Sequence, residues 1–153
     1  MRQDTVAIVT GGSFPGGRQV ARGLAGWDWA IAVVYLEHQR AVEETIAQVL
    51  AAEGRIVAVR ADIADDLDVR RLFAESSAAF GEVDVVAHTT TQPAGLLYRH
   101  TVRHLRIGGA IVSASAADGL APDVERALRE RGIGVGRAPP DGLLAFLDRW
   151  RRR

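Results

Sequence analysis

The sequence predicts an α/β fold of the doubly wound class, with a parallel sheet of about six strands in a single domain. Short β-branched runs alternate with longer segments of helical period, which is the pattern of βαβ units. Right-handed crossovers between such strands place helices on both faces of a parallel sheet. The length of 153 residues suits one domain, residues 1–153, and at about 30 residues a unit it supplies roughly five units.

The first part of the chain contains three predicted strands, at 5–9, 30–35 and 56–59. The first two are apolar at successive positions, as expected for strands buried on both faces of a sheet. Between them, Val20 and Leu24 lie four residues apart on a helix that Gly26 ends. The next helix ends before Gly54, and its apolar residues follow the amphipathic spacing i, i+4, i+7, i+8: Val42, Ile46, Val49 and Leu50.

The rest of the chain continues the alternation. Asp65 or Asp66 can cap a helix whose inward residues are Val69, Leu72, Phe73 and Phe80. Strands are predicted at 83–87 and 110–114, followed by a glycine-diluted one at 132–136 and a last helix at 143–150. The crossovers after the fourth and fifth strands, 89–108 and 116–131, are short.

Composition excludes several classes of function. Nineteen basic residues balance nineteen acidic ones, so net charge gives no support for a partner made of nucleic acid or a membrane surface. Cysteine is absent, which removes disulfides, thiolate metal sites and a cysteine nucleophile. All nineteen basic residues are arginine, so no lysine amine is available for catalysis. No apolar run approaches the roughly 18–20 residues that cross a bilayer, and we expect a cytoplasmic protein.

A glycine-rich turn follows the first strand, with the sequence Thr10-Gly11-Gly12-Ser13-Phe14-Pro15-Gly16-Gly17-Arg18. A strand, a glycine turn and a helix start together form the usual binding site for a dinucleotide pyrophosphate. Glycines have no side chain, so the phosphates can approach the backbone and the N–H groups at the helix N-terminus. The alternative is a tight turn with no ligand.

The turn resembles the TGxxxGxG motif of short-chain dehydrogenases/reductases, in the stretch from Val9 to Arg18. The likeness continues in order through the chain, and its nearest type is the 3-oxoacyl-acyl-carrier-protein reductases. The further matching segments are Val34-Tyr35, Ala41-Val42-Glu43-Glu44, Gly54-Arg55, Ala61-Asp62-Ile63, Phe80-Gly81-Glu82-Val83-Asp84 and Gly109-Ala110-Ile111-Val112.

This resemblance implies a set of cofactor-binding residues. The pyrophosphate and adenosine ribose would contact Gly11, Ser13, Phe14, Gly16 and Gly17. Tyr35, Leu36 and Glu37 would lie by the ribose 2′ position. Asp62 would bind the adenine amine beside Ile63, unless it is only a turn or capping carboxylate. His88 and Thr89 take the place of the family's segment near the nicotinamide ribose, although His88 also suits a hydrogen-bonded histidine at a strand end.

The chain departs from the family in its catalytic residues and in the turn. Pro15 stands where the family has its second glycine, which removes one N–H donor and biases Phe14 towards extended backbone. The family's catalytic serine falls on Ala116, with Ser115 as its neighbour. The remaining tyrosines, Tyr35 and Tyr98, match no Tyr-x-x-x-Lys pair, in which lysine lowers the tyrosine pKa. We therefore assign no catalytic residue.

A basic stretch without carboxylates runs from 85 to 117. Within it Arg99, Arg103 and Arg106 follow i, i+4, i+7 and would share a helix face. They could contact an acidic partner, an acyl-carrier protein or a nucleotide phosphate, or they could form an ordinary solvated face. His100 and His104 have metal-ligand spacing, but we expect no nearby carboxylate or cysteine to complete a site, and the flanking arginines repel cations, so we expect no metal.

Three functions remain open. The first is a nucleotide-binding scaffold without standard carbonyl reductase activity. The second is an NAD(P)-dependent oxidoreductase that uses Tyr98 or His88 as proton donor. The third is an accessory subunit of a full-length reductase, and a homo-oligomer or such a heteromer is the expected assembly. The absence of an aspartate at the end of the second strand favours NADP, held through Arg18 or Arg40, whereas Glu37 would repel its 2′-phosphate.

Overall fold

The described residues form one sheet of six parallel strands, as the sequence predicts. The structure is a computed structural model and describes residues 4–115 and 118–153. The strand order is β3-β2-β1-β4-β5-β6. The strands are β1 (Val6–Val9), β2 (Ala30–Tyr35), β3 (Arg55–Arg60), β4 (Val85–His88), β5 (Ala110–Ser113) and β6 (Gly134–Arg137).

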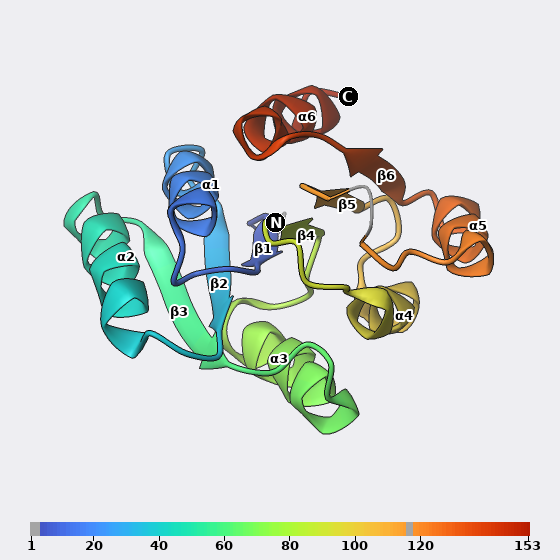
Figure 1. The fold of residues 1–153 in the computed structure, drawn as a ribbon. Coiled ribbons are helices and arrows are strands. Elements are labelled where there is room, and N and C mark those ends of the chain that lie inside the picture. Colours follow the sequence, from blue (N-terminus) through green and yellow to red (C-terminus); the bar gives the residue numbers. More distant parts are fainter. Residues whose placement is uncertain (1–3, 116–117) are drawn as a thin grey trace.

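Three helices cover each face of this sheet, which gives three layers (Figure 1). On one face lie α1 (Pro15–Ala25), α2 (Gln39–Ala51) and α6 (Leu143–Arg151), the last entered through a short 3₁₀ turn, η1 (Pro140–Gly142). On the other face lie α3 (Asp66–Phe80), α4 (Gly95–His104) and α5 (Pro122–Glu130). The doubly wound arrangement is therefore confirmed.

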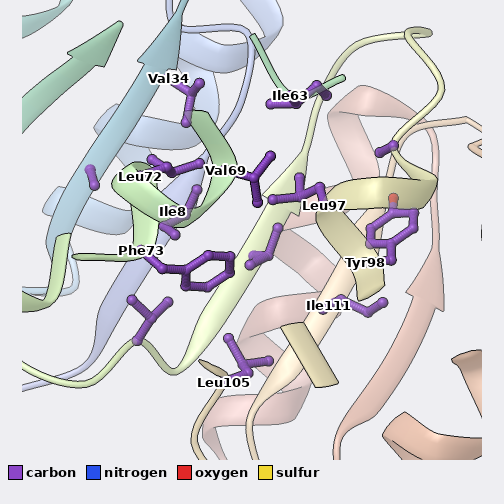
Figure 2. Packing of buried hydrophobic residues seen from close by; sticks show 14 of the residues in the cluster. Ile8, Val34, Ile63, Val69, Leu72, Phe73, Leu97, Tyr98, Leu105 and Ile111 are labelled. Carbon is purple, nitrogen blue, oxygen red and sulfur yellow. The ribbon is translucent and has the colours of Figure 1, made fainter. Parts of the chain in front are cut away.

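The strands are buried on both faces because alternate side chains enter two separate cores. In β1, Ile8 packs towards α3, whereas its neighbours Ala7 and Val9 pack towards α1 and α2. Figure 2 shows the first of these cores, where Ile8 and Val34 from the sheet meet Leu72 and Phe73 of α3. This two-sided burial explains why apolar residues run without alternation in the sequence.

The helix boundaries follow local chemistry. Pro15 occupies the first turn of α1, and Gly26 follows its last residue. The α3 helix is capped by Asp65, whose side chain accepts the N–H of Leu67 at 3.1 Å. Of the two capping candidates, Asp65 is thus the one used.

Two expectations about helix faces are wrong. Leu50, expected on the buried face of α2, is 54% exposed. The buried face of this helix consists of Val42, Thr45 and Val49. Arg106 lies after α4, which ends at His104, and it pairs with Asp84 at 2.8 Å. It therefore does not continue the face of Arg99 and Arg103.

All strands are parallel, but the order in which they were added changes side at β1: β2 and β3 lie on one side of it, and β4, β5 and β6 on the other. Val9 pairs with Val33 on one side and with Ala87 on the other, so three strands end at the same edge. In open parallel sheets such a reversal leaves a crevice at the carboxyl ends of the strands, where ligands bind. None of the helices formed by the described residues is long and apolar enough to cross a membrane.

Candidate functional site

A recess of about 300 Å³ lies at the carboxyl edge of the sheet, between the ends of β1, β2 and β3 and the loop after β4. It lies at the reversal point of the strand order. The residues that line it are Thr10, Gly11, Ser13, Phe14, Val34, Tyr35, Leu36, Glu37, His38, Ala61, Asp62, Ile63, Thr90 and Gln92. They come from four separate segments, which the parallel topology brings together.

The glycine turn forms one wall of the recess, and its geometry requires glycine at two positions. Gly11 has a φ of +70°, and a Cβ there would lie 2.5 Å from Thr89 Oγ1. A Cβ on Gly17 would lie 2.1 Å from the carbonyl oxygen of Gly11. The first turn of α1 thus packs directly on the backbone of the glycine turn.

The N-terminus of α1 carries no capping side chain. Phe14 occupies the N-cap position in extended backbone, with a φ of −118° and a ψ of 156°, as Pro15 predicts. Pro15 has no N–H, so Gly16 and Gly17 supply the next backbone donors of the first turn, which in any α-helix lack intrahelical partners. An anion at this end would find both the free N–H groups and the positive end of the helix dipole.

The loop after β2 closes over the turn through Ser13. The Ser13 hydroxyl donates to the carbonyl oxygen of Glu37 at 2.7 Å. His38 has a left-handed φ of 60°, and its ring contacts Phe14 edge-on at 6.1 Å between centroids. Phe14 is 51% exposed and lines the recess.

The charges that line the recess are negative. Among the described residues it contains the carboxylates of Glu37 and Asp62 and no arginine. Arg18, a candidate for a 2′-phosphate, is instead held on α2, where it pairs with Glu44 at 3.3 Å and donates to Thr45 Oγ1 at 3.2 Å. Arg40 is exposed and lies outside the lining. Neither arginine expected to hold a 2′-phosphate therefore lines the recess.

Asp62 combines a structural role with an open oxygen. Its Oδ1 accepts the N–H of Ala64 at 2.9 Å, which is the turn role considered for it. Its own N–H donates to Asp68 at 2.8 Å, and this bond lowers the pKa of the Asp68 carboxyl. Asp62 still lines the recess, and beside it Ile63 is 4% exposed in the core.

His88 lies at the end of β4 but does not line the recess. Its ring is fully buried, with Nδ1 2.9 Å from Thr10 Oγ1 and Nε2 2.6 Å from the carbonyl oxygen of Gln92. A carbonyl only accepts, so Nε2 carries the proton and Nδ1 accepts from the Thr10 hydroxyl. Burial lowers the pKa of His88, in keeping with a neutral ring. His88 thus joins β1 to the loop after β4, the bonded role considered for it.

Tyr98 is also closed off from the recess. It is 1% exposed on α4, its hydroxyl donates to Asp118 Oδ2 at 3.4 Å, and Asp118 pairs with Arg137 at 3.5 Å. Figure 2 shows Tyr98 packed in the core near Leu97 and Ile111. Burial raises the pKa of the phenol well above its usual value. Ala116, where the family's catalytic serine falls, lies outside the described residues.

The histidine pair on α4 has a carboxylate that the sequence spacing does not reveal. His100 Nε2 lies 2.8 Å from Asp66 Oδ1 on α3, so the expectation of no nearby carboxylate is wrong. Within residues 4–115 and 118–153 no group of three or more His, Cys, Asp or Glu side chains is placed to hold a metal ion.

The structure therefore divides the residues implied by the sequence. Eight of them line the recess: Gly11, Ser13, Phe14, Tyr35, Leu36, Glu37, Asp62 and Ile63. Gly16, Gly17 and His88 are not among its lining residues: the two glycines belong to the first turn of α1, which adjoins the glycine turn, and His88 is buried at the end of β4. The further lining residues Thr10, Thr90 and Gln92 stand at or just after strand ends, and the carboxyl-edge rule could have identified them. No pattern in the sequence singles out His38.

Comparison with known proteins gives the same family as the motifs. A family model described as short chain dehydrogenase matches residues 5–107. The hydroxynaphthalene reductase-like protein Arp2 of Metarhizium robertsii is 28% identical over 134 residues, which cover 72% of this chain and 50% of the relative. A 3-oxoacyl-[acyl-carrier-protein] reductase of Synechocystis is 30% identical over 83 residues, 54% of this chain and 34% of the relative.

The fold also matches solved structures over most of its length. A metagenomic short-chain oxidoreductase in complex with NADP superposes with a TM-score of 0.79 at 17% identity, covering 97% of this chain and 90% of the other. At this identity the likeness establishes the fold. The chain spans half the length of the Arp2 relative that it matches.

Proposed function

This chain belongs to the short chain dehydrogenase family, and on that premise we propose that it binds a nicotinamide dinucleotide without standard carbonyl reductase activity. The observation that carries the proposal is the contrast between an open recess at the glycine turn and a proton donor that is buried elsewhere. The bound cofactor would supply a hydride. The chain's own residues would position it but would not protonate a carbonyl oxygen.

The recess supports dinucleotide binding through three kinds of contact. The uncapped first turn of α1 offers backbone N–H groups to the pyrophosphate, at Gly16 and Gly17. Phe14 offers an exposed aromatic face on the adenosine side. The open carboxylate oxygen of Asp62 would accept the adenine amine, since Ala64 occupies the other one.

The ribose end of the recess supports a cofactor with a free 2′-hydroxyl. Glu37 lines this end and would accept hydrogen bonds from a ribose diol, but it would repel a 2′-phosphate. Arg18, which could have compensated that charge, is engaged with Glu44 and Thr45. These two contacts support NAD over NADP, against the direction suggested by the second strand alone.

The lack of carbonyl reduction follows from the titratable groups near the strand ends. Reduction of a ketone needs a group that donates a proton to the oxygen as hydride arrives. Tyr98 is buried, its pKa is raised, and no lysine exists in the chain to lower it. Burial lowers the pKa of His88, and both of its ring nitrogens are already bonded inside the protein.

The proposal is tested by calorimetric titration of the purified chain with NADH and with NADPH, followed by a ketone-reduction assay at saturating cofactor. We expect saturable NADH binding, weaker NADPH binding, and no oxidation of either cofactor above the rate without protein. Clear turnover would contradict the proposal and support an oxidoreductase with non-standard catalytic residues. Silence in both assays would also contradict it and would favour an accessory subunit.

A further inference from the structure

A second recess, of about 300 Å³, lies between α3 and α4 and shares no residue with the first. Figure 1 shows these two helices side by side on one face of the sheet. The side chains that line the recess are Asp66, Arg70, Leu96, Arg99, His100 and Arg103. Nearly all are polar, and most can carry positive charge.

The charges in this recess are not balanced. Its one carboxylate, Asp66, is shared by two neighbours: Arg70 Nε at 2.9 Å and His100 Nε2 at 2.8 Å. Arg99 and Arg103 form no ion pair with the residues that the structure describes. Their two positive charges are therefore uncompensated.

Several arginines near this recess are paired. On α3, Arg71 pairs with Glu75 at 3.0 Å, and after α4, Arg106 pairs with Asp84 at 2.8 Å. Arg126 on α5 also forms no ion pair with a described residue, but it is exposed and lies outside the recess. Arg99 and Arg103 are thus set apart because they line one recess together without a carboxylate partner.

The geometry of α4 directs both guanidinium groups to one place. Arg99 and Arg103 are four residues apart, so they lie one above the other on the same helix face. Arg70 on α3 supplies a third guanidinium from the opposite wall. Planar guanidinium groups bind carboxylate and phosphate oxygens in bidentate fashion, and phosphate offers enough oxygens for all three.

His100 adds an independent polar group. It is 9% exposed, and its Nδ1 has no hydrogen-bond partner among the described residues. Its Nε2 is bonded to Asp66 Oδ1, whereas Arg70 pairs with the other oxygen of the same carboxylate, Oδ2. Asp66, the one carboxylate in the lining, is thus engaged by both Arg70 and His100.

We propose that the recess between α3 and α4 is a binding site for a small phosphate monoester, held by Arg99, Arg103 and Arg70. The volume lies at the lower end of small-molecule sites, at about 300 Å³. Leu96 is the one apolar side chain in the lining, so the body of the ligand is polar, as in a sugar phosphate, and not an acyl chain. The concave shape favours a small ligand over the broad face of an acidic protein.

The test uses calorimetric titration of the full chain with glucose 6-phosphate, with glucose and with sodium chloride at matched ionic strength. We expect saturable binding of the phosphate ester alone. The double variant Arg99→Gln/Arg103→Gln should weaken it by about tenfold or more, because two charge-assisted contacts are lost. The matched variant Arg126→Gln/Arg149→Gln removes the same charge from exposed sites on α5 and α6 and should leave the affinity unchanged.

A gain of affinity separates the proposal from simple misfolding. Asp66→Asn removes the competing carboxylate, so we expect phosphate-ester binding to tighten by a few-fold. Saturating NADH should leave the phosphate-ester affinity unchanged, since the two recesses share no residue. Absence of saturable binding, equal loss in both double variants, or binding of an acidic peptide in place of the phosphate ester would overturn the proposal.

Discussion

The two halves of the sheet end in opposite ways at the same edge. Beyond β1, β2 and β3 the polar groups are open: they line a recess together with the glycine turn. Beyond β4 and β5, apart from Thr90 and Gln92 at the recess, they are closed, with His88 fully buried, Ser113 3% exposed and Asp118 2% exposed. Catalytic and binding groups must reach a ligand, so the first half keeps the means to bind, whereas the second has turned its polar groups into structural bonds.

The closed half is satisfied by its own contacts. Ser113 Oγ both donates to the carbonyl oxygen of Ser115 and accepts its N–H, each at 3.1 Å. Tyr98 bonds Asp118, and Asp118 bonds Arg137 and the N–H of Leu120. A group whose bonds are all made inside the protein stabilises the fold but is not free to exchange a proton with a substrate.

The largest effect is expected from adding one methyl group in the open half. Gly17→Ala would place a Cβ 2.1 Å from the Gly11 carbonyl oxygen, so we expect a loss of stability of about 3 kcal/mol and no measurable NADH binding. The measurement is chemical denaturation together with cofactor titration.

The matched control is the same change in the closed half. Gly134→Ala on β6 would meet its nearest atom at 3.7 Å, an ordinary contact, and should alter stability by no more than about 0.5 kcal/mol. If both substitutions cost the same, the close packing of the glycine turn is not what distinguishes the two halves.

The next effect concerns the buried phenol. Tyr98→Phe removes one donor to Asp118 while Arg137 still pairs with that carboxylate, so stability should fall by about 1 kcal/mol. NADH affinity should not change, because Tyr98 lies outside the recess. A changed cofactor affinity, measured by titration, would show that the closed half takes part in binding.

A smaller effect tests the ribose end of the open half. Glu37→Gln removes a negative charge from the recess and should raise NADPH affinity by about fivefold, with NADH affinity slightly reduced. Glu43→Gln, on α2 and outside the recess, serves as the control and should change neither affinity. Unchanged NADPH binding in Glu37→Gln would remove Glu37 as the determinant of cofactor choice.

The smallest effect is a dependence of stability on pH. Burial lowers the pKa of His88 below its usual value of 6.5, so below that pH the unfolded state binds more protons than the folded state. Stability should therefore fall as the pH drops from 7 to 5. His88→Leu should lower stability at pH 7 but flatten this dependence, as followed by thermal unfolding. An equally steep dependence in the variant would assign it to other groups, among them His104, whose pKa is also lowered by burial.

The fold was predictable because its cues are local. Runs such as 30–35 are apolar at every position, and β2 spans the same residues. The glycine turn was predictable for a similar reason, since the φ of +70° at Gly11 and the close contact at Gly17 both demand glycine. The family motifs then placed Asp62 and Tyr35 at the recess.

The rest depended on contacts between segments far apart in the chain. The carboxylate beside His100 comes from Asp66, thirty-four residues away, and no spacing on α4 reveals it. Arg106 does not share a helix face with Arg99 and Arg103, because α4 ends at His104. Arg18 bonds Thr45 on α2, and His88 bonds Thr10 at the end of the neighbouring strand. The sequence pattern does not identify these partners, because they become neighbours only in the packed fold.

We propose that the open half binds the dinucleotide while the closed half stays outside the contact. Amide hydrogen exchange with and without saturating NADH measures this directly. We expect slower exchange in segments 10–17, 35–38 and 61–63, with no change in 97–105 and 118–120. Slower exchange around Tyr98 and Asp118, equal to that at the glycine turn, would contradict it.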